Sequence, residues 1–388
     1  MSRKSKGLED DFYLVCLGQQ NGGEPTFFWA EGPFEKVGNL DSREPLLVLS
    51  EFWDSNPSLY RFKKFQILNI LELKKKLREK ISECLGSNFE NLPRAGEVFE
   101  KLEMEISQNP EALLSFKENF QKSMNLLNEG TLEKIVPWVS AQCEMEKGSE
   151  GKASLSLFSL FLDLLNNFQF SEANVSYPYA FSVEGQGMLG VSPEFLLKSD
   201  EGYKFQSLAL AGTSHSKDTD ELLKREKDLS EHGFVVQDIC DRLKRIVEVS
   251  ELNVGATLVW QSGLVKHLRT VISFNLDPNQ ASRVLRDLHP TAALGGFPRG
   301  EILWKTLKSF ENHIKRKFFG APVGLLGVGK LPTLVLVAIR GLECVKTAGT
   351  HFWVQSSGCG IVRSSTLEKE WAELALKRSA VRRFWGLA

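Results

Sequence analysis

The amino-acid sequence predicts a single α+β unit built around large antiparallel sheets. Long apolar stretches with strand character, such as residues 179–197 and 256–276, are mixed with helix-like stretches from about residue 132 onward. These stretches do not follow the regular strand–helix alternation that a parallel sheet requires. The chain has 388 residues, of which 42% are apolar, so it can bury a substantial core. No internal repeat or low-complexity linker divides the sequence.

The expected elements follow in order along the chain. From Phe12 to about Trp53, short apolar runs alternate with Gly, Asn and Pro, as strands and turns do. Helical spacing of apolar residues then predicts one amphipathic helix, carried by Phe65, Leu68, Leu71, Leu77 and Ile81, and a second over residues 111–127. Beyond them we expect a long helix from about Asp220 to Glu248 and strands over residues 179–197, 203–213, 256–276, 333–345 and 351–362.

Composition excludes several classes of function. The 48 basic and 49 acidic residues leave no net charge to attract nucleic acid or an anionic membrane. The six cysteines show no C-x-x-C spacing, which disfavours a zinc site and a disulfide framework. The first residues lack the apolar segment of a secretion signal, and no stretch reaches the roughly 18 apolar residues of a membrane helix. We therefore expect a cytoplasmic protein.

One glycine-rich segment, Gly324–Lys330, has the spacing of a phosphate-binding loop. Leu331 stands where such a loop needs a Ser or Thr to bind Mg²⁺. The segment also leads into an apolar strand rather than a helix, so no helix N-terminus faces a phosphate. The segment is predicted to be a hairpin turn.

Two carboxylate pairs are the most informative feature of the chain. Asp228 and Glu231 lie three residues apart in one helix-like stretch, and Glu370 and Glu373 lie three residues apart in another. This spacing puts both members of a pair on one helix face. If the two helices meet, four acidic groups converge, and oxygen ligands of this kind suit Mg²⁺.

Two further residues have the local setting of proton-transfer groups. Lys134 precedes an apolar pair, so a partly desolvated amine could act as a general base, although most such lysines only extend to water. Glu194 follows Pro193 between apolar residues, which would raise its pKa and make it a proton donor. The alternative for Glu194 is a strand-end carboxylate that points to water.

Other candidates could bind an anion. Arg340 interrupts an apolar strand, where a guanidinium must pair with an internal carboxylate or bind a carboxylate ligand. Gly358 and Gly360 allow close backbone approach to an anion, or form a plain tight turn. His289 begins a loop rich in turn-forming residues, and its alternative role is structural, through a hydrogen bond to backbone.

The order of these segments resembles that of the chorismate-utilising enzymes, which include isochorismate synthase, salicylate synthase, anthranilate synthase component I and aminodeoxychorismate synthase. The matching segments are EKIV, LGVSPEFLL, LALAGT, EKDLSEH, LHPTAALGGFP, RKFFGAPVG, VAIRG, SGCGIV and EKEWAELALK, which cover roughly residues 130–385. The resemblance implies two large, mainly antiparallel sheets packed face to face, with helices outside. It also implies a chorismate-binding catalytic region over residues 126–388, and residues 1–125 are assigned by position to a variable N-terminal part of the same fold.

Within this family the chain is most similar to isochorismate synthase. Members that add water resemble it in having lysine at position 134, whereas the ammonia-using and aminodeoxychorismate branches carry glutamine. Ala211 replaces the lysine of the aminodeoxychorismate branch, and LHPT around His289 is typical of the isochorismate and salicylate branches. The expected enzyme adds water to chorismate in menaquinone or siderophore biosynthesis. It would act as a monomer or homodimer without a glutamine amidotransferase. Salicylate synthase and a non-catalytic chorismate-binding subunit remain the alternatives.

The resemblance also implies roles for individual residues. Lys134 would be the general base and Glu194 the general acid. Mg²⁺ would be bound directly by Glu231 and Glu373, and through water by Asp228 and Glu370. Substrate-binding positions would be Ala211, Gly212, Thr213, His289, Arg340, Gly358, Cys359, Gly360 and Lys377. The chain departs from the family pattern at four positions. Val139 replaces the usual arginine, Ala292 a proline, Leu325 a tryptophan and Cys359 an alanine.

Overall fold

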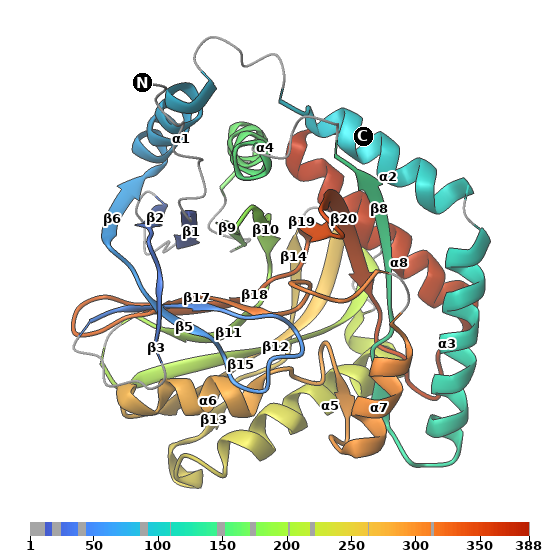
Figure 1. Cartoon of the computed structure of the whole chain (residues 1–388). Helices are drawn as coiled ribbons and strands as arrows, with labels where there is room; N and C mark the ends of the chain where they lie inside the picture. The colour runs from blue at the N-terminus through green and yellow to red at the C-terminus, as the bar shows by residue number, and fades with distance from the viewer. Residues whose placement is uncertain are drawn as a thin grey trace.

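The protein forms two large β-sheets with helices on their outer faces (Figure 1). A computed structural model describes residues 12–17, 25–37, 44–85, 92–108, 110–145, 152–170, 176–200, 202–217, 222–262, 264–311 and 314–387. Every strand pairing among these residues is antiparallel. The predicted fold, with two large antiparallel sheets packed face to face, is confirmed.

The first sheet has eight strands, and its strands in spatial order are β6 (Lys64–Asn69), β2 (Thr26–Glu31), β1 (Phe12–Leu17), β9 (Tyr177–Val183), β10 (Gln186–Ser192), β19 (Gly341–Thr347), β20 (Thr350–Gly358) and β8 (Trp138–Glu144). The second sheet has ten strands, and its main path is β13 (Asn253–Val254), β15 (Val265–Asn275), β12 (Lys204–His215), β11 (Phe195–Ser199), β18 (Thr333–Val337), β17 (Pro322–Leu326), β4 (Leu46–Leu49), β5 (Leu59–Arg61) and β3 (Glu35–Val37), with β14 (Leu258–Ser262) paired to β15. A separate two-stranded ladder joins β7 (Lys134–Ile135) to β16 (Gly296–Phe297). Strands from the first 70 residues thus belong to both large sheets.

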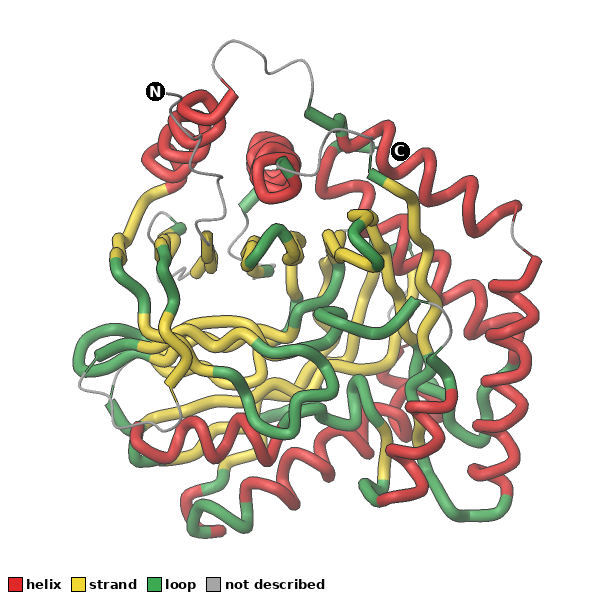
Figure 2. Tube along the Cα trace, viewed as in Figure 1, coloured by secondary structure: helices red, strands yellow, loops and turns green. Residues whose placement is uncertain are grey.

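The helices cover the outer faces of the two sheets, so the fold has helix, sheet, sheet and helix layers (Figure 2). The helices are α1 (Ile70–Leu85), α2 (Ala95–Gln108), α3 (Pro110–Asn128), α4 (Ala153–Asn167), α5 (Glu226–Leu243), α6 (Ala281–Leu288), α7 (Glu301–Ser309) and α8 (Leu367–Arg382). α1, α2 and α4 pack on the eight-stranded sheet, whereas α5, α6 and α7 pack on the ten-stranded sheet.

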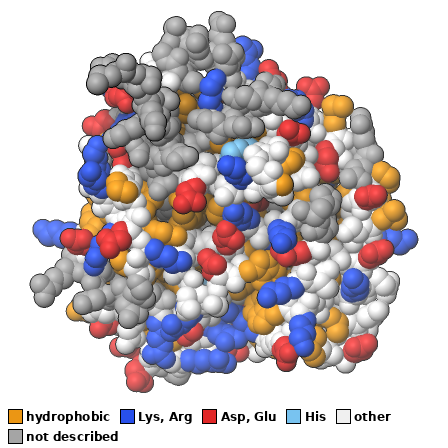
Figure 3. All heavy atoms as spheres, viewed as in Figure 1, with side chains coloured by type: hydrophobic (Ala, Val, Ile, Leu, Met, Phe, Trp, Pro, Cys, Tyr) orange, Lys and Arg blue, Asp and Glu red, His pale blue; other side chains and the backbone are white. Residues whose placement is uncertain are grey.

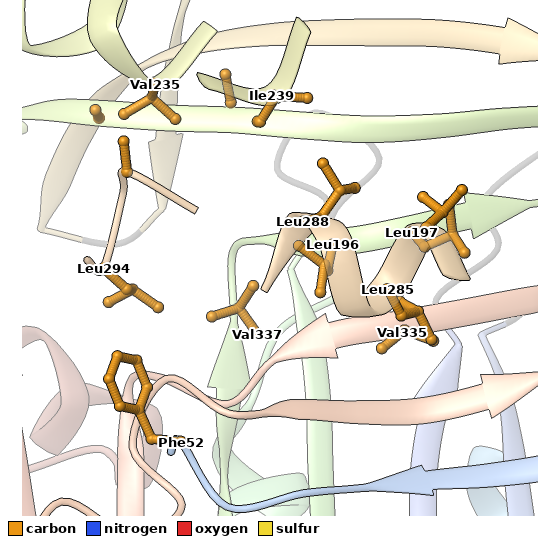
Figure 4. Packing of buried hydrophobic residues seen from close by; sticks show 14 of the residues in the cluster. Phe52, Leu196, Leu197, Val235, Ile239, Leu285, Leu288, Leu294, Val335 and Val337 are labelled. Carbon is orange, nitrogen blue, oxygen red and sulfur yellow. The ribbon is translucent and has the colours of Figure 1, made fainter. Parts of the chain in front are cut away.

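Side-chain alternation along the strands explains this layering. In β2, Phe27 and Trp29 pack under the helices, while Phe28 packs between the sheets. In β18, Val335 packs against the helices beside the ten-stranded sheet, while Leu334 packs between the sheets. Because successive side chains of a strand point to opposite faces, a continuous apolar run supplies two cores at once. The helix-side core of the ten-stranded sheet includes Val235 and Ile239 of α5, Leu285 and Leu288 of α6 and Val335 and Val337 of β18 (Figure 4).

The predicted first amphipathic helix is wrong at its beginning. Phe65 and Leu68 lie in β6, which pairs with β2, and the helix begins only at Ile70. The side chain of Asn69 accepts hydrogen bonds from amides of the first helical turn, and Glu72 accepts the amide of Asn69 at 2.8 Å. This reciprocal cap fixes where the helix begins, whereas pairing with a distant strand decides the conformation before it.

Three other predicted elements can be compared directly. The helix over residues 111–127 is confirmed as α3, and the long helix is confirmed but shorter, because α5 spans Glu226–Leu243. The glycine-rich segment that resembled a phosphate-binding loop forms the end of β17 and the start of the turn to β18, and the two strands pair as an antiparallel hairpin. Its interpretation as a turn is confirmed.

The molecular surface carries both signs of charge. Basic and acidic side chains are interspersed over most of the face in Figure 3. Within the described part of the chain, no helix has the length and apolarity needed to cross a bilayer. The thiols of Cys84, Cys143, Cys240, Cys344 and Cys359 are free, whereas the side chain of Cys16 lies outside the described residues.

Candidate active site

Two crossings of the chain between the sheets bring distant site residues together. The chain leaves the eight-stranded sheet after β10 and enters the ten-stranded sheet at β11, with Glu194 between them. It crosses back between β18 and β19, where Arg340 lies. Backbone hydrogen bonds join the crossings: the amide of Val337 donates to the carbonyl of Glu194, and the amide of Val191 donates to the carbonyl of Arg340, each at 3.1 Å.

A pocket opens beside these crossings. Its wall includes the predicted metal ligand Glu231 and most of the residues predicted for substrate binding and catalysis, namely Glu194, Ala211, Gly212, Thr213, Arg340, Gly358, Gly360 and Lys377. The floor is formed partly by β12, whose pairing with β15 shifts register between Ala211 and Thr213. Gly212 has φ 70° at this irregularity, a conformation that favours glycine. The strand irregularity therefore shapes the pocket floor.

Glu194 presents a protonated carboxyl to this pocket at neutral pH. Its side chain is buried, and Oε1 has no hydrogen-bond partner. Burial raises the pKa of Glu194 to about 8, although the positive charges of Lys134, Lys377 and Arg340 act in the opposite direction. This is the shift that the apolar sequence neighbours predict, and a carboxyl in this state can donate a proton.

Lys134 lies directly behind the pocket wall. It is 1% exposed and belongs to β7, and its Nζ lies 3.3 Å from Oε1 of Glu231. Burial lowers the pKa of Lys134, while Glu231 opposes that shift. A Cβ on Gly360 would lie 2.7 Å from Cε of Lys134 and would collide with Oε1 of Glu231. The glycine is therefore required for the lysine and the carboxylate to approach each other at the pocket.

The two carboxylate-bearing helices meet, as predicted. They meet around Lys227, which the sequence analysis did not identify as a site residue. The ammonium of Lys227 lies 3.1 Å from Oε2 of Glu231, 3.1 Å from Oε1 of Glu370 and 3.8 Å from Oε2 of Glu373. Lys227 and Glu231 belong to α5, and Glu370 and Glu373 belong to α8. The fourth predicted acid, Asp228, is buried in the first turn of α5.

The carboxylates of this cluster are not electrostatically equivalent. Burial would raise the pKa of Glu231, but Lys227 and Lys134 lower it to about 2. Burial, reinforced by Glu373, raises the pKa of Glu370 to about 7. Burial raises the pKa of Asp228 to about 6, against the effect of Lys227. The most firmly ionised of these three carboxyls, Glu231, is also the only one of them on the pocket wall.

Arg340 lies at the pocket in a constrained backbone conformation. The sequence suggested that it interrupts a strand, but it lies at the crossing between β18 and β19 with φ 59°. Its Nη2 donates to Nε2 of His267 at 2.8 Å, so this contact is made to an imidazole and not to the carboxylate of the alternative interpretation. Nδ1 of His267 lies 3.0 Å from the carbonyl of Gly212, which it can donate to in this tautomer. His267 therefore holds Arg340 against the pocket floor.

The segment with Gly358 and Gly360 is fixed by Lys377. Nζ of Lys377 donates to the carbonyl of Gly358 at 2.7 Å and lies 2.7 Å from Oε1 of Glu373. Gly358, Gly360 and Lys377 all line the pocket. The ammonium of Lys377 thus connects the glycine segment, the acidic cluster and the pocket.

Two predicted substrate contacts are not supported by their positions. His289 does not line the pocket; its Nε2 contacts the carbonyl of Phe52 at 2.9 Å and the two rings pack edge to face. It is the structural histidine of the alternative interpretation. The side chain of Cys359 is fully buried in the apolar core and also does not line the pocket.

Sequence reasoning missed Lys227 and His267. Lys227 lies next to Asp228 and one helical turn before Glu231, so its position in the helix could have indicated an ion pair. His267 is buried in β15, and a buried polar side chain needs a hydrogen-bond partner. Neither signal identifies that partner without the tertiary structure.

The acidic cluster has the donor chemistry for a hard divalent cation. Its carboxylates already surround one positive charge, and Oε2 of Glu370 is buried with no hydrogen-bond partner. Among the described residues, no three carboxylate, imidazole or thiol groups are already arranged as a metal site, because Lys227 lies between these acids. The residues present therefore fit a metal ion only if Lys227 moves.

Comparison with solved structures supports the fold. The chain matches a 2,3-dihydroxybenzoate-specific isochorismate synthase, DhbC from Bacillus anthracis, with a TM-score of 0.69, 19% identity and coverage of 98% of this chain and 97% of that chain. It matches the menaquinone-specific isochorismate synthase MenF from Escherichia coli with a TM-score of 0.67, 20% identity and coverage of 98% and 90%. It also matches anthranilate synthase component I from Streptococcus pneumoniae with a TM-score of 0.60, 15% identity and coverage of 96% and 90%.

Curated relatives give closer sequence matches over shorter regions. The chain is 36% identical over 203 residues to the salicylate biosynthesis isochorismate synthase of Pseudomonas aeruginosa, covering 50% of this chain and 41% of that protein. It is 32% identical over 228 residues to isochorismate synthase EntC of Escherichia coli K12, covering 55% of each. It is 27% identical over 282 residues to the vibriobactin-specific isochorismate synthase of Vibrio cholerae, covering 69% of this chain and 65% of that protein. The matched regions thus span less than two thirds of these proteins.

The sequence pattern of a whole family covers most of the chain. Residues 63–385 match the family described as chorismate binding enzyme. This region includes both sheet crossings, the acidic cluster and the pocket. The chain belongs to the chorismate-binding enzymes.

Proposed function

We propose that the protein is a Mg²⁺-dependent isochorismate synthase, which converts chorismate to isochorismate. The observation that carries the proposal is the buried carboxyl of Glu194 at the pocket, with an unpartnered oxygen and a pKa raised to about 8. Burial without a partner destabilises a carboxylate far more than a protonated carboxyl, so the proton is retained at neutral pH. A general acid for a departing hydroxyl needs such a proton.

The reaction replaces one hydroxyl by another. A water molecule adds at C2 of chorismate, the double bonds shift, and the C4 hydroxyl leaves as water. Glu194 gives its proton to the oxygen that departs from C4, and Lys134 takes a proton from the water that attacks C2. The substrate and product are therefore isomers, and exchange of protons with solvent restores the two side chains.

Lys134 has the environment of a general base. Burial lowers its pKa, which increases the fraction of neutral amine that can accept a proton. Its contact with Glu231 fixes the amine behind Gly360, at the edge of the pocket. The usual arginine after this lysine is replaced by Val139. The contact with Glu231 would supply the orientation that such a residue would otherwise give.

Two cations suit the two carboxylates of chorismate. Arg340 lies at the pocket with Nη2 of its guanidinium hydrogen-bonded to His267, and its planar fork fits a carboxylate. Lys377 lines the pocket beside the amides of the glycine segment. These groups would bind and orient the dianion, which lowers the entropic part of the barrier.

Mg²⁺ would be bound by Glu231 and Glu373, with Asp228 and Glu370 around it. When bound, it would supply positive charge that neutralises a substrate carboxylate. Two direct protein ligands suffice, because Mg²⁺ commonly keeps several water molecules. The relatives named above carry the names of menaquinone and siderophore enzymes. We propose that the product enters a pathway of one of these two kinds.

A single assay tests the proposal. Purified protein is incubated with chorismate and Mg²⁺, and the products are separated by chromatography. Isochorismate as the product supports the proposal. Salicylate together with pyruvate would instead identify a salicylate synthase, and unchanged chorismate would indicate a binding subunit without turnover.

A further inference from the structure

Lys227 occupies the centre of the acidic cluster. Its ammonium lies within 3.8 Å of carboxylate oxygens from Glu231, Glu370 and Glu373. Glu231 belongs to α5, whereas Glu370 and Glu373 belong to α8, which lies far along the sequence. A single cation therefore holds the acidic faces of α5 and α8 together.

Glu231 and Glu373, the two expected direct metal ligands, each direct one carboxylate oxygen toward Lys227 and the other toward a second lysine. Glu231 directs Oε1 toward Lys134 at 3.3 Å and Oε2 toward Lys227 at 3.1 Å. Glu373 directs Oε1 toward Lys377 at 2.7 Å and Oε2 toward Lys227 at 3.8 Å. One oxygen of each carboxylate thus contacts Lys134 or Lys377, and the other faces the ammonium of Lys227. Removal of that ammonium would free one oxygen from each.

Lys227 can leave this position more easily than its neighbours can. Its side chain is 23% exposed, compared with 1% for Lys134 and 16% for Lys377. It lies in the first turn of α5, where the helix dipole disfavours a cation and favours carboxylates. Its flexible four-carbon stem allows the ammonium to reach solvent.

We infer that Lys227 is the exchangeable counter-ion of the metal site: its ammonium neutralises the acidic cluster without metal and must swing outward before a divalent cation binds. The inference rests on the metal site of the proposed function and adds a residue that controls it. The Lys227 ammonium fills the space between the carboxylates where Mg²⁺ would have to lie, so occupation by Lys227 and occupation by Mg²⁺ exclude each other. Lys227 therefore weakens metal binding while stabilising the metal-free protein.

The test uses Mg²⁺ alone, without chorismate. Lys227→Met removes the charge and keeps most of the apolar stem, and Lys224→Met provides a matched control at an exposed position nearby. Titration calorimetry should give a dissociation constant for Mg²⁺ that is about tenfold lower in Lys227→Met, the usual size of a coupling between ligands. Thermal unfolding in EDTA should occur at a lower temperature in this variant, and Mg²⁺ should reverse the difference. Lys224→Met should behave as the wild type in both measurements.

A second measurement needs only the wild-type chain, so it remains informative if Lys227→Met does not fold. Lysines are acetylated briefly with acetic anhydride in EDTA or in saturating Mg²⁺, and the labelled positions are identified by mass spectrometry. Labelling of Lys227 should rise several-fold with Mg²⁺, whereas labelling of Lys224 should stay constant.

The outcomes separate this inference from the proposed function. Equal Mg²⁺ affinity in the wild type and Lys227→Met, or unchanged labelling of Lys227 while Mg²⁺ binds, would overturn the counter-ion role and leave the proposed enzyme intact. Absence of Mg²⁺ binding in both proteins would overturn the metal site itself, and with it the inference.

Discussion

Replacement of Glu194 by glutamine should make the protein more stable at alkaline pH and strongly reduce its activity. The wild-type carboxyl has a pKa of about 8 when folded, because burial raises it from the ordinary value of 4.5. Between these two values the folded protein holds a proton that the unfolded chain has lost. The stabilising contribution of the protonated carboxyl is therefore fully present below about pH 4.5 and is lost as pH rises through about 8.

The size of this effect follows from the same values. Each pH unit between the two pKa values corresponds to about 1.4 kcal/mol. Ionising Glu194 in the folded state therefore costs on the order of 5 kcal/mol over the whole window. Glutamine keeps the shape of the protonated carboxyl without this loss. The free energy of unfolding of Glu194→Gln, relative to wild type, should increase by about 3 kcal/mol between about pH 5.5 and about pH 8.5.

Urea unfolding at the two pH values measures this difference, and chorismate turnover measures the loss of activity, expected to be about 10²-fold to 10⁴-fold for a missing general acid. The exposed variant Glu129→Gln is the control and should show no such pH dependence. If the free energies of unfolding of wild type and Glu194→Gln differ by the same amount at both pH values, the carboxyl ionises normally. The assignment of Glu194 as general acid would then lose its physical basis.

Other substitutions test the remaining roles. Lys134→Met should reduce turnover about 10²-fold to 10⁴-fold with an unchanged near-ultraviolet circular dichroism spectrum, and near-wild-type turnover would remove Lys134 as the base. Gly360→Ala should reduce turnover strongly, because the new methyl group meets Glu231 and Lys134; full activity would contradict the close approach at this position. Arg340→Lys should raise KM for chorismate about tenfold through loss of the planar fork, and an unchanged KM would place the substrate carboxylate elsewhere. Supplying ammonium should yield no anthranilate, and its ready formation would contradict the inference of water as nucleophile.

The pattern of residue types determined most of the fold class. Apolar runs such as that of β18 carry side chains for both faces of a strand, which is why they predict a sheet buried on two sides. The three-residue spacing of Asp228 and Glu231 was enough to predict that both lie on one helix face. The same local reasoning failed at Phe65, because pairing of β6 with β2 overrides helical spacing.

The amino-acid sequence by itself determined the helix faces, the alternating strands, the family resemblance and the unusual surroundings of Glu194. Only the tertiary structure decided that two crossings between sheets join Glu194 to Arg340, that His289 is bound to the backbone of Phe52, and that Lys227 lies among the acids of two helices. The physical reason is that these contacts link residues far apart in the chain. Local periodicity specifies which face a side chain occupies, whereas the partner of that face depends on how the whole chain packs.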